Sequence, residues 1–325
     1  MEHGNNIDMM TLSWFVPEIR ESLQHVAHAL DELRANPHGQ DAIKRARLHL
    51  HQTHGALQVA GISGVALLTE EAEHVLSAFE DGVLEADESS IGVLKMVMRA
   101  ITEYLEDMQA SGTSIPVLVL YPYYRDLVGL RKAVQPDPAA LFDVDLDRAL
   151  PASVRAMISD APDREERAKS AARGFERALP ALIRGENVVA AIDGLHESMG
   201  RMLRNQPHVG ARLFYWLSYA LLDGLKHGAL KVDLATRRAV GRINIQNRHL
   251  FTGQSDVPPQ FIKELLIILA QAGSGSAVVE EVKRHFHLAS LVPADYERRR
   301  YGLADPETIR IAREALVLVH RAWEK

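Results

Sequence analysis

The sequence predicts an all-α protein built from two helical bundles, and three observations support this. Apolar residues recur at three- and four-residue steps through most of the chain, which is the spacing of one buried helix face. No segment shows the alternating pattern and turn signals of β-strands with comparable strength. The 325 residues, 47% hydrophobic and 25% charged, are enough for about two globular domains.

The first bundle is expected at residues 8–134. Its four main helices are predicted at 11–35, 41–60, 65–79 and from 88 to about 108. Short loops join them, and short loops connect antiparallel neighbours, so we expect an up-and-down antiparallel four-helix core. A fifth element begins near Pro116. Its β-prone residues would allow a strand, but a proline at a first helical turn favours an added helix.

A polar, proline-bearing stretch at residues 135–161 is the best candidate for a linker between domains. Helical patterns resume beyond it, so a second all-α domain is predicted at residues 162–325. The expected helices of that domain lie at 163–184, 186–204, 207–227, 230–251, 258–272, 277–286 and 306–322.

Composition excludes several classes of protein. The net charge of −6 argues against a nucleic-acid binder that works through bulk positive charge. With no cysteine, the chain has no disulfide, cysteine-based zinc site or thiol nucleophile. No apolar run approaches the ~20 residues of a membrane span, and the N-terminus lacks a secretion signal. We therefore expect a cytoplasmic protein without a direct membrane span.

The predicted helix at 41–60 carries the residues with the clearest chemical potential. Leu50 lies on its buried seam, so the residues about one third of a turn away form an exposed stripe. An exposed imidazole can accept a phosphoryl group, a neighbouring cation offsets the charge, and a glycine leaves room for a partner. A solvated histidine at a helix edge is the alternative, since the chain has 15 histidines. The stripe contains Arg47, His51, His54, Gly55 and Gln58.

The stretch HQTHGA, beginning at His51, resembles the His-x-x-Lys-Gly-Ser motif of histidine phosphotransfer (HPt) domains. Longer blocks, among them LHLHQTHGALQVAGISGVALLTEEAEHVLSAFEDG and RGENVVAAIDGLHESMGRML, resemble one branch of that family. This branch is the N-terminal region of the CheA-type chemosensory histidine kinases of type IV pilus systems (ChpA/PilL), and the pilus regulator FimL shares it. The resemblance covers residues 10–285.

The resemblance implies a signalling domain of the two-component pathway that controls twitching motility, with His51 as the phosphoacceptor. Its partners would be proteins, either a receiver domain or pilus and chemosensory components, and it would be recruited to the cell pole. Two departures from the motif matter: His54 replaces the lysine and Ala56 the serine. A neutral imidazole stabilises phosphate less than lysine does. A degenerate, non-phosphorylated scaffold of the FimL type is therefore the alternative, while retention of His51 favours the kinase branch.

Other chemistries find little support in the sequence. His49 diverges from His51 and His54 on a helix, and no carboxylate completes a metal site, so neither a metal nor a cofactor is expected. The acidic cluster Glu70, Glu71 and Glu73 is interpreted as a solvated helix face. Nothing resembles the ATP-binding module of a histidine kinase. The chain is therefore expected to be no enzyme by itself, although it could be the N-terminal part of a kinase.

Overall fold

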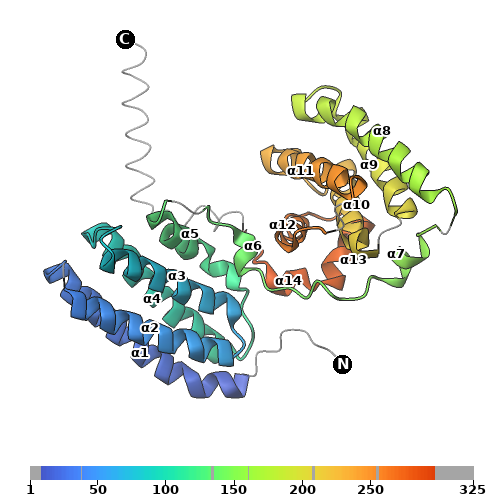
Figure 1. Cartoon of the computed structure of the whole chain (residues 1–325). Helices are drawn as coiled ribbons and strands as arrows, with labels where there is room; N and C mark the ends of the chain where they lie inside the picture. Colours follow the sequence, from blue (N-terminus) through green and yellow to red (C-terminus); the bar gives the residue numbers. More distant parts are fainter. Residues whose placement is uncertain are drawn as a thin grey trace, which may run out of the picture. The chain divides into compact units, whose positions relative to one another are not determined.

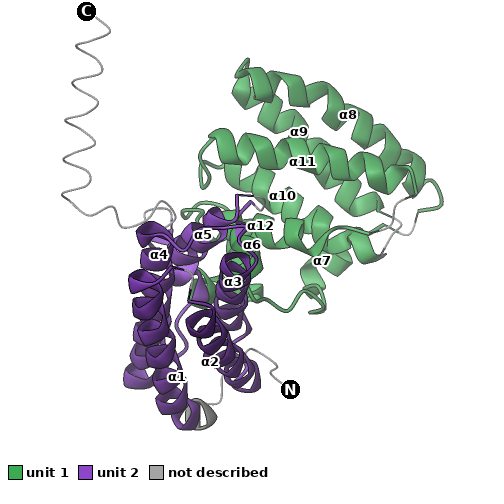
Figure 2. Cartoon of the chain, turned by 60° about the vertical axis from the view of Figure 1, so that its left-hand side comes forward, with its two compact units in different colours: residues 1–6, 138–294 green, residues 7–137, 295–325 purple. Residues whose placement is uncertain are grey.

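The computed structural model describes residues 9–37, 39–132, 135–159, 161–206, 209–253 and 256–296. Throughout these ranges the regular structure is helical, without a strand, which confirms the predicted all-α class (Figure 1). Contacts divide the chain into two compact units, coloured separately in Figure 2. Unit 1 holds the described residues from 138 to 294, and unit 2 holds those up to 137 together with Asp295 and Tyr296.

Unit 2 is the predicted up-and-down four-helix core with an added helix (Figure 1). In this bundle α1 packs against α2 and α4, α2 also packs against α3, and α5 lies against α3 and α4. The apolar seams predicted from the sequence are the buried ones, since Leu23, Leu50 and Leu68 are almost completely inaccessible to solvent. The helices are α1 (Met9–Ala35), α2 (Gln40–Val59), α3 (Ser63–Glu80), α4 (Glu88–Ser111) and α5 (Tyr121–Leu130).

A three-residue turn between α2 and α3 fixes how these two helices face each other. Gly61 takes a left-handed conformation with φ of +75°, which an L side chain rarely adopts. The amide of Ile62 then donates to the Leu57 carbonyl at 2.9 Å, which closes the end of α2. Because the turn is so short, residues equally distant from it on α2 and α3 lie opposite each other.

The segment after Pro116 is helical, as the proline at its start favoured, and does not form a strand. A 3₁₀ turn at Val117–Leu120 leads directly into α5. Leu118 and Leu120 of the β-prone run are buried within the 3₁₀ turn, and Tyr121, Tyr124 and Leu127 form the buried face of α5.

Unit 1 is organised around α10 (Arg212–Lys226), which packs against α9, α12 and α13. Its aromatic run Phe214, Tyr215 and Trp216 is buried almost completely, and most of its other residues are buried too, as expected of a helix in the centre of a domain. The other main helices of this unit are α8 (Arg164–Arg184), α9 (Val188–Asn205), α11 (Leu234–Phe251), α12 (Pro259–Ala270) and α13 (Ala277–His285).

The stretch expected as a linker, residues 135–161, contains short helices and buried side chains. Helix α6 (Pro138–Leu141) packs against α12, and α7 (Ala152–Ala156) follows, with Phe142 and Val154 buried. The predicted domain limits 8–134 and 162–325 stay a proposal, and the expected helix at 306–322 lies outside the described residues. No helix in the described ranges has the length and apolarity needed to cross a membrane.

Leu48 and Leu50, two residues apart on α2, provide a matched test of how this helix packs in the bundle. Leu50 is completely buried, whereas Leu48 is 57% exposed. Leu50→Ala should lower the free energy of unfolding by about 2–5 kcal/mol, because it removes buried apolar surface and leaves a cavity. Leu48→Ala should change it by about 0.5 kcal/mol or less. Urea denaturation of the full chain measures both, and equal losses would contradict the described packing of α2.

Candidate functional site

His51 lies in the middle of α2 and projects into solvent. Its side chain is 76% exposed, so a partner protein can reach the imidazole. The ring nitrogen Nδ1 lies 3.6 Å from Oε2 of Glu73, which comes from the facing helix α3. The Glu73 side chain is only 22% exposed, so the carboxylate is partly fixed by its surroundings.

The Glu73 carboxylate, 3.6 Å from Nδ1 of His51, lies beyond hydrogen-bond distance but close enough to attract a proton on that nitrogen. A carboxylate attracts the proton-bearing nitrogen of a neutral imidazole, so the proton is favoured on Nδ1. The lone pair then resides on Nε2, the nitrogen farther from Glu73. An imidazole in this tautomer can attack an electrophile through Nε2 while the carboxylate holds the ring and offsets the positive charge that develops.

His54, expected beside His51 on the exposed stripe, is half-buried and turned toward α3. Its Nδ1 lies 3.0 Å from the carbonyl oxygen of Ala66, to which it donates, and 3.3 Å from Oγ1 of Thr69. The Thr69 hydroxyl also donates to the Ala66 carbonyl, at 2.6 Å. His54 therefore links α2 to the first turn of α3, and this bond fixes its Nδ1 away from His51.

The other members of the predicted stripe differ in how free they are. Arg47 forms an ion pair with Glu80 of α3, so its charge is already offset. Gln58 is exposed. Gly55 has open space above it, because a Cβ built on it would meet no atom within 4 Å. Arg47, His51 and His54 thus each have a partner on α3, and only part of the stripe is left free for a partner protein.

The acidic cluster on α3 is only partly the solvated face that the sequence predicts, because two of its members have defined partners. Glu71 lies 2.8 Å from Arg131 and 3.7 Å from His74, and Glu73 faces His51. Only Glu70 is fully exposed. The sequence did contain a signal for Glu73: positions 51 and 73 are nearly equidistant from the turn at Gly61, so antiparallel helices bring them together.

Unit 1 contains a buried polar network that the sequence analysis missed. The Asp223 carboxylate accepts from Nε2 of His196 at 3.0 Å and from the Ser276 hydroxyl at 2.6 Å. His227, one turn along α10, lies 3.3 Å from the same carboxylate. Ser276 also caps α13, because its Oγ accepts from the Val279 amide. The network therefore joins α9, α10 and α13.

Asp223 stays ionised in this network. Burial would raise the pKa of its carboxyl group, but the hydrogen bonds from His196 and Ser276 and the nearby His227 outweigh burial, so the pKa lies below its ordinary value. The connectivity is unlike that of a serine hydrolase, because Ser276 donates to the aspartate and not to the histidine. Across the described ranges, no group of three or more His, Cys, Asp or Glu side chains is placed to hold a metal ion.

Comparisons with known proteins agree with this division into two parts. Residues 10–111, which cover α1 to α4, match the Hpt domain family. Residues 160–299 match the family described as the second domain of the FimL scaffold protein. No solved structure matches the chain significantly.

A curated relative spans both parts. The chain is 22% identical over 290 residues to the scaffold protein FimL of Pseudomonas aeruginosa, an alignment that covers 88% of this chain and 51% of the relative. The chain thus spans about half the length of the curated relative that it matches. The retained His51 favoured the kinase branch of the resemblance, but these findings support the FimL side. The chain is similar to the scaffold protein FimL over most of its length, and its first part is similar to Hpt domains.

Proposed function

We propose that the chain is a non-catalytic signalling scaffold of a type IV pilus chemosensory pathway, and that its Hpt-like bundle accepts a phosphoryl group at His51. One observation carries this proposal: His51 is 76% exposed on the second helix of the bundle, with Nδ1 directed to the Glu73 carboxylate. The match to the Hpt domain family and the likeness to FimL support the signalling or scaffold class.

The proposed transfer is a direct exchange between His51 and a receiver-domain aspartate. Nε2 of His51 attacks the phosphorus of the phosphoaspartate, so an N–P bond forms as the P–O bond to the aspartate breaks. The aspartate leaves as a carboxylate, and the Nδ1 proton stays on the ring against Glu73. The open space above Gly55 lets the partner approach the helix closely.

The charges around His51 make the phosphorylated state short-lived in this proposal. Arg47 is paired with Glu80, and His54 is bonded to the Ala66 carbonyl, so neither cation candidate is free to stabilise a phosphoryl group. The Glu73 carboxylate adds like charge beside it. We infer that His51 passes phosphate on quickly and does not store it.

The remaining parts of the proposal concern cellular context. The partners are a receiver domain and pilus or chemosensory components, and the output is control of twitching motility. The chain acts in the cytoplasm with recruitment to a cell pole. These assignments rest on the resemblance of the sequence blocks to pilus-system proteins and on the relative named as a scaffold.

A second candidate function is a phosphate-free scaffold, and the same charge pattern favours it. With Glu73 beside His51 and both expected cations occupied, the bundle would dock partners without ever carrying phosphate. Under this alternative the exposed side of α2 is a protein-binding surface alone.

Phosphorylation separates the two candidates. The full chain is incubated with the kinase core of a pilus CheA-type system, its receiver and labelled ATP, beside an isolated Hpt domain as positive control. We expect an acid-labile, base-stable label that His51→Gln abolishes. The exposed His28 offers a matched control, so His28→Gln should keep the label. An unlabelled wild-type chain in rapidly quenched samples, beside a labelled positive control, would establish the phosphate-free scaffold instead.

Glu73 is expected to set the rate of transfer. Glu73→Gln removes the charge that orients the His51 ring, and loss of orientation should slow phosphoryl transfer by about 100-fold. Rapid-quench measurement of labelling from the charged receiver gives this rate. Glu70→Gln, three residues earlier on the exposed face of α3, serves as the control and should leave the rate unchanged. Equal rates in the two variants would mean that Glu73 has no positioning role.

The space above Gly55 is expected to be needed for docking under either candidate. Gly55→Arg fills this space and should weaken receiver binding roughly tenfold or more through steric exclusion. Gly92 of α4 is the control, since it also lies within a helix and has nothing within 4 Å of a built Cβ. Titration of the receiver with Gly55→Arg and Gly92→Arg compares them. If both variants bind the receiver as wild type does, docking takes place elsewhere.

A further inference from the structure

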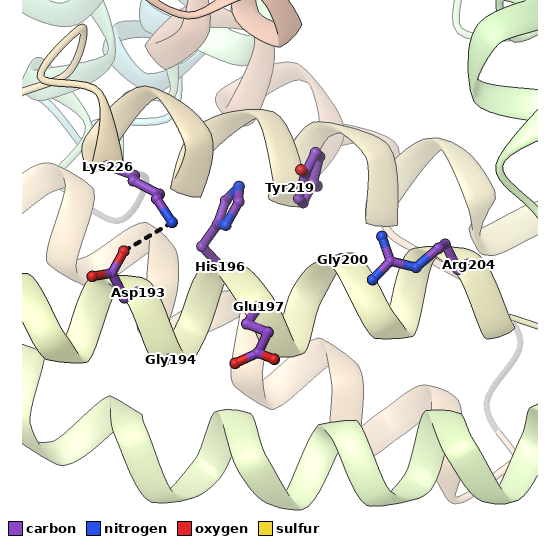
Figure 3. Close-up of a pocket in the computed structure, with 8 residues that line it drawn as sticks. All are labelled: Asp193, Gly194, His196, Glu197, Gly200, Arg204, Tyr219 and Lys226. Carbon is purple, nitrogen blue, oxygen red and sulfur yellow. Dashed lines mark ion pairs between the residues drawn. The ribbon is translucent and has the colours of Figure 1, made fainter.

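A groove of about 330 Å³ lies between α9 and α10 (Figure 3). All of its lining residues belong to unit 1, and none to the Hpt-like bundle. Five of its lining residues bring polar groups from two helices to one place. Asp193, His196 and Arg204 come from α9, and Tyr219 and Lys226 come from α10. The volume is near the lower end for ligand pockets, so it suits a small molecule.

The charges of the groove leave one cation without a partner. Lys226 lies 2.9 Å from Asp193, so these two charges offset each other. Glu197 points away from α10 in Figure 3 and is paired with Arg201 at 2.5 Å. Within the described ranges no carboxylate pairs with Arg204. The groove therefore offers an available guanidinium, whose fixed fork of N–H donors matches the geometry of carboxylate and phosphate.

A second donor lies next to this guanidinium. A Cβ built on Gly200 would lie 3.1 Å from Cε2 of Tyr219 and 3.6 Å from Nη1 of Arg204. Both side chains therefore converge on the same point of α9, where glycine leaves them room. The Tyr219 hydroxyl has no hydrogen-bond partner among the residues that the structure describes, so its O–H remains available to donate.

The groove is held rigid by the buried network. The His196 ring stacks on Tyr219, with ring centroids 4.7 Å apart, and its Nε2 is bonded to the Asp223 carboxylate. Asp223 is fixed in turn by Ser276. A wall fixed in this way loses little conformational freedom when a ligand binds. Burial and the Asp223 carboxylate raise the pKa of Tyr219 above its ordinary value, and the nearby Arg204 and Lys226 act against that rise.

We propose that this groove binds the phosphate or carboxylate group of a small molecule, with the Arg204 guanidinium and the Tyr219 hydroxyl as its donors. The Asp193–Lys226 pair closes the opposite end of the groove and limits the size of the ligand. The site is independent of phosphoryl transfer at His51.

Equilibrium dialysis of the full chain tests the site, with labelled inorganic phosphate as the probe at fixed ionic strength. We expect one phosphate per chain. Arg204→Gln should weaken binding roughly tenfold or more, and Tyr219→Phe about threefold, because they remove a charged donor and a neutral donor. Arg238→Gln, at an exposed arginine of α11, is the matched control and should bind as wild type does. His51→Gln should also bind as wild type, which excludes capture at the Hpt-like bundle.

Competition with succinate separates the two ligand classes. Displacement of phosphate at a lower concentration of succinate than of unlabelled phosphate assigns the site to carboxylates, and the reverse order assigns it to phosphates. Equal losses in Arg204→Gln and Arg238→Gln would show nonspecific charge attraction and overturn the proposal. Absence of stoichiometric binding of both anions would overturn it as well.

Discussion

The three-residue turn between α2 and α3 determines the surroundings of His51. Gly61 reverses the chain so tightly that the two helices must pack along their full length. Their facing positions then pair as His51 with Glu73, His54 with the first turn of α3, and Arg47 with Glu80. A longer or looser turn would change this register and give His51 different neighbours. The chemistry of the exposed His51 imidazole therefore depends on both α2 and α3, although the sequence motif lies on α2 alone.

The fold could be predicted from the sequence to a large extent because burial follows periodicity. Leu50 and Leu57 share one seam of α2, and both are completely buried. The direction of individual polar side chains could not be predicted in the same way. His54 was placed on the exposed stripe by helical angle alone, yet its ring finds a backbone acceptor on α3 that a single-helix projection cannot represent.

The polar network of unit 1 could not be predicted from the sequence either, for a different reason. Asp223 lies 27 residues from His196 and 53 from Ser276, so no local spacing connects the three. Taken alone, His196 and Asp223 are ordinary helix residues and Ser276 is an ordinary helix cap, so none of them indicates a network. Only the packing of α9 and α13 on α10 brings them together, and burial of the carboxylate is what makes its three partners necessary. The two histidines thus differ in kind: His51 is exposed beside one carboxylate, and His196 is enclosed in a bonded network.

The central position of α10 has a consequence for how unit 1 is made on the ribosome. Residues 212–226 are synthesised well before α12 and α13, which cover them, so α9 is at first their main available cover. Until about 60 further residues have been added, the rings of Trp216 and Phe214 lack much of their native environment. Ser276, which caps α13 and also bonds to Asp223, then joins the later-made α13 to α10. Synthesis of this half of the chain therefore passes through a stage in which the aromatic rings of α10 are incompletely covered and exposed to aggregation.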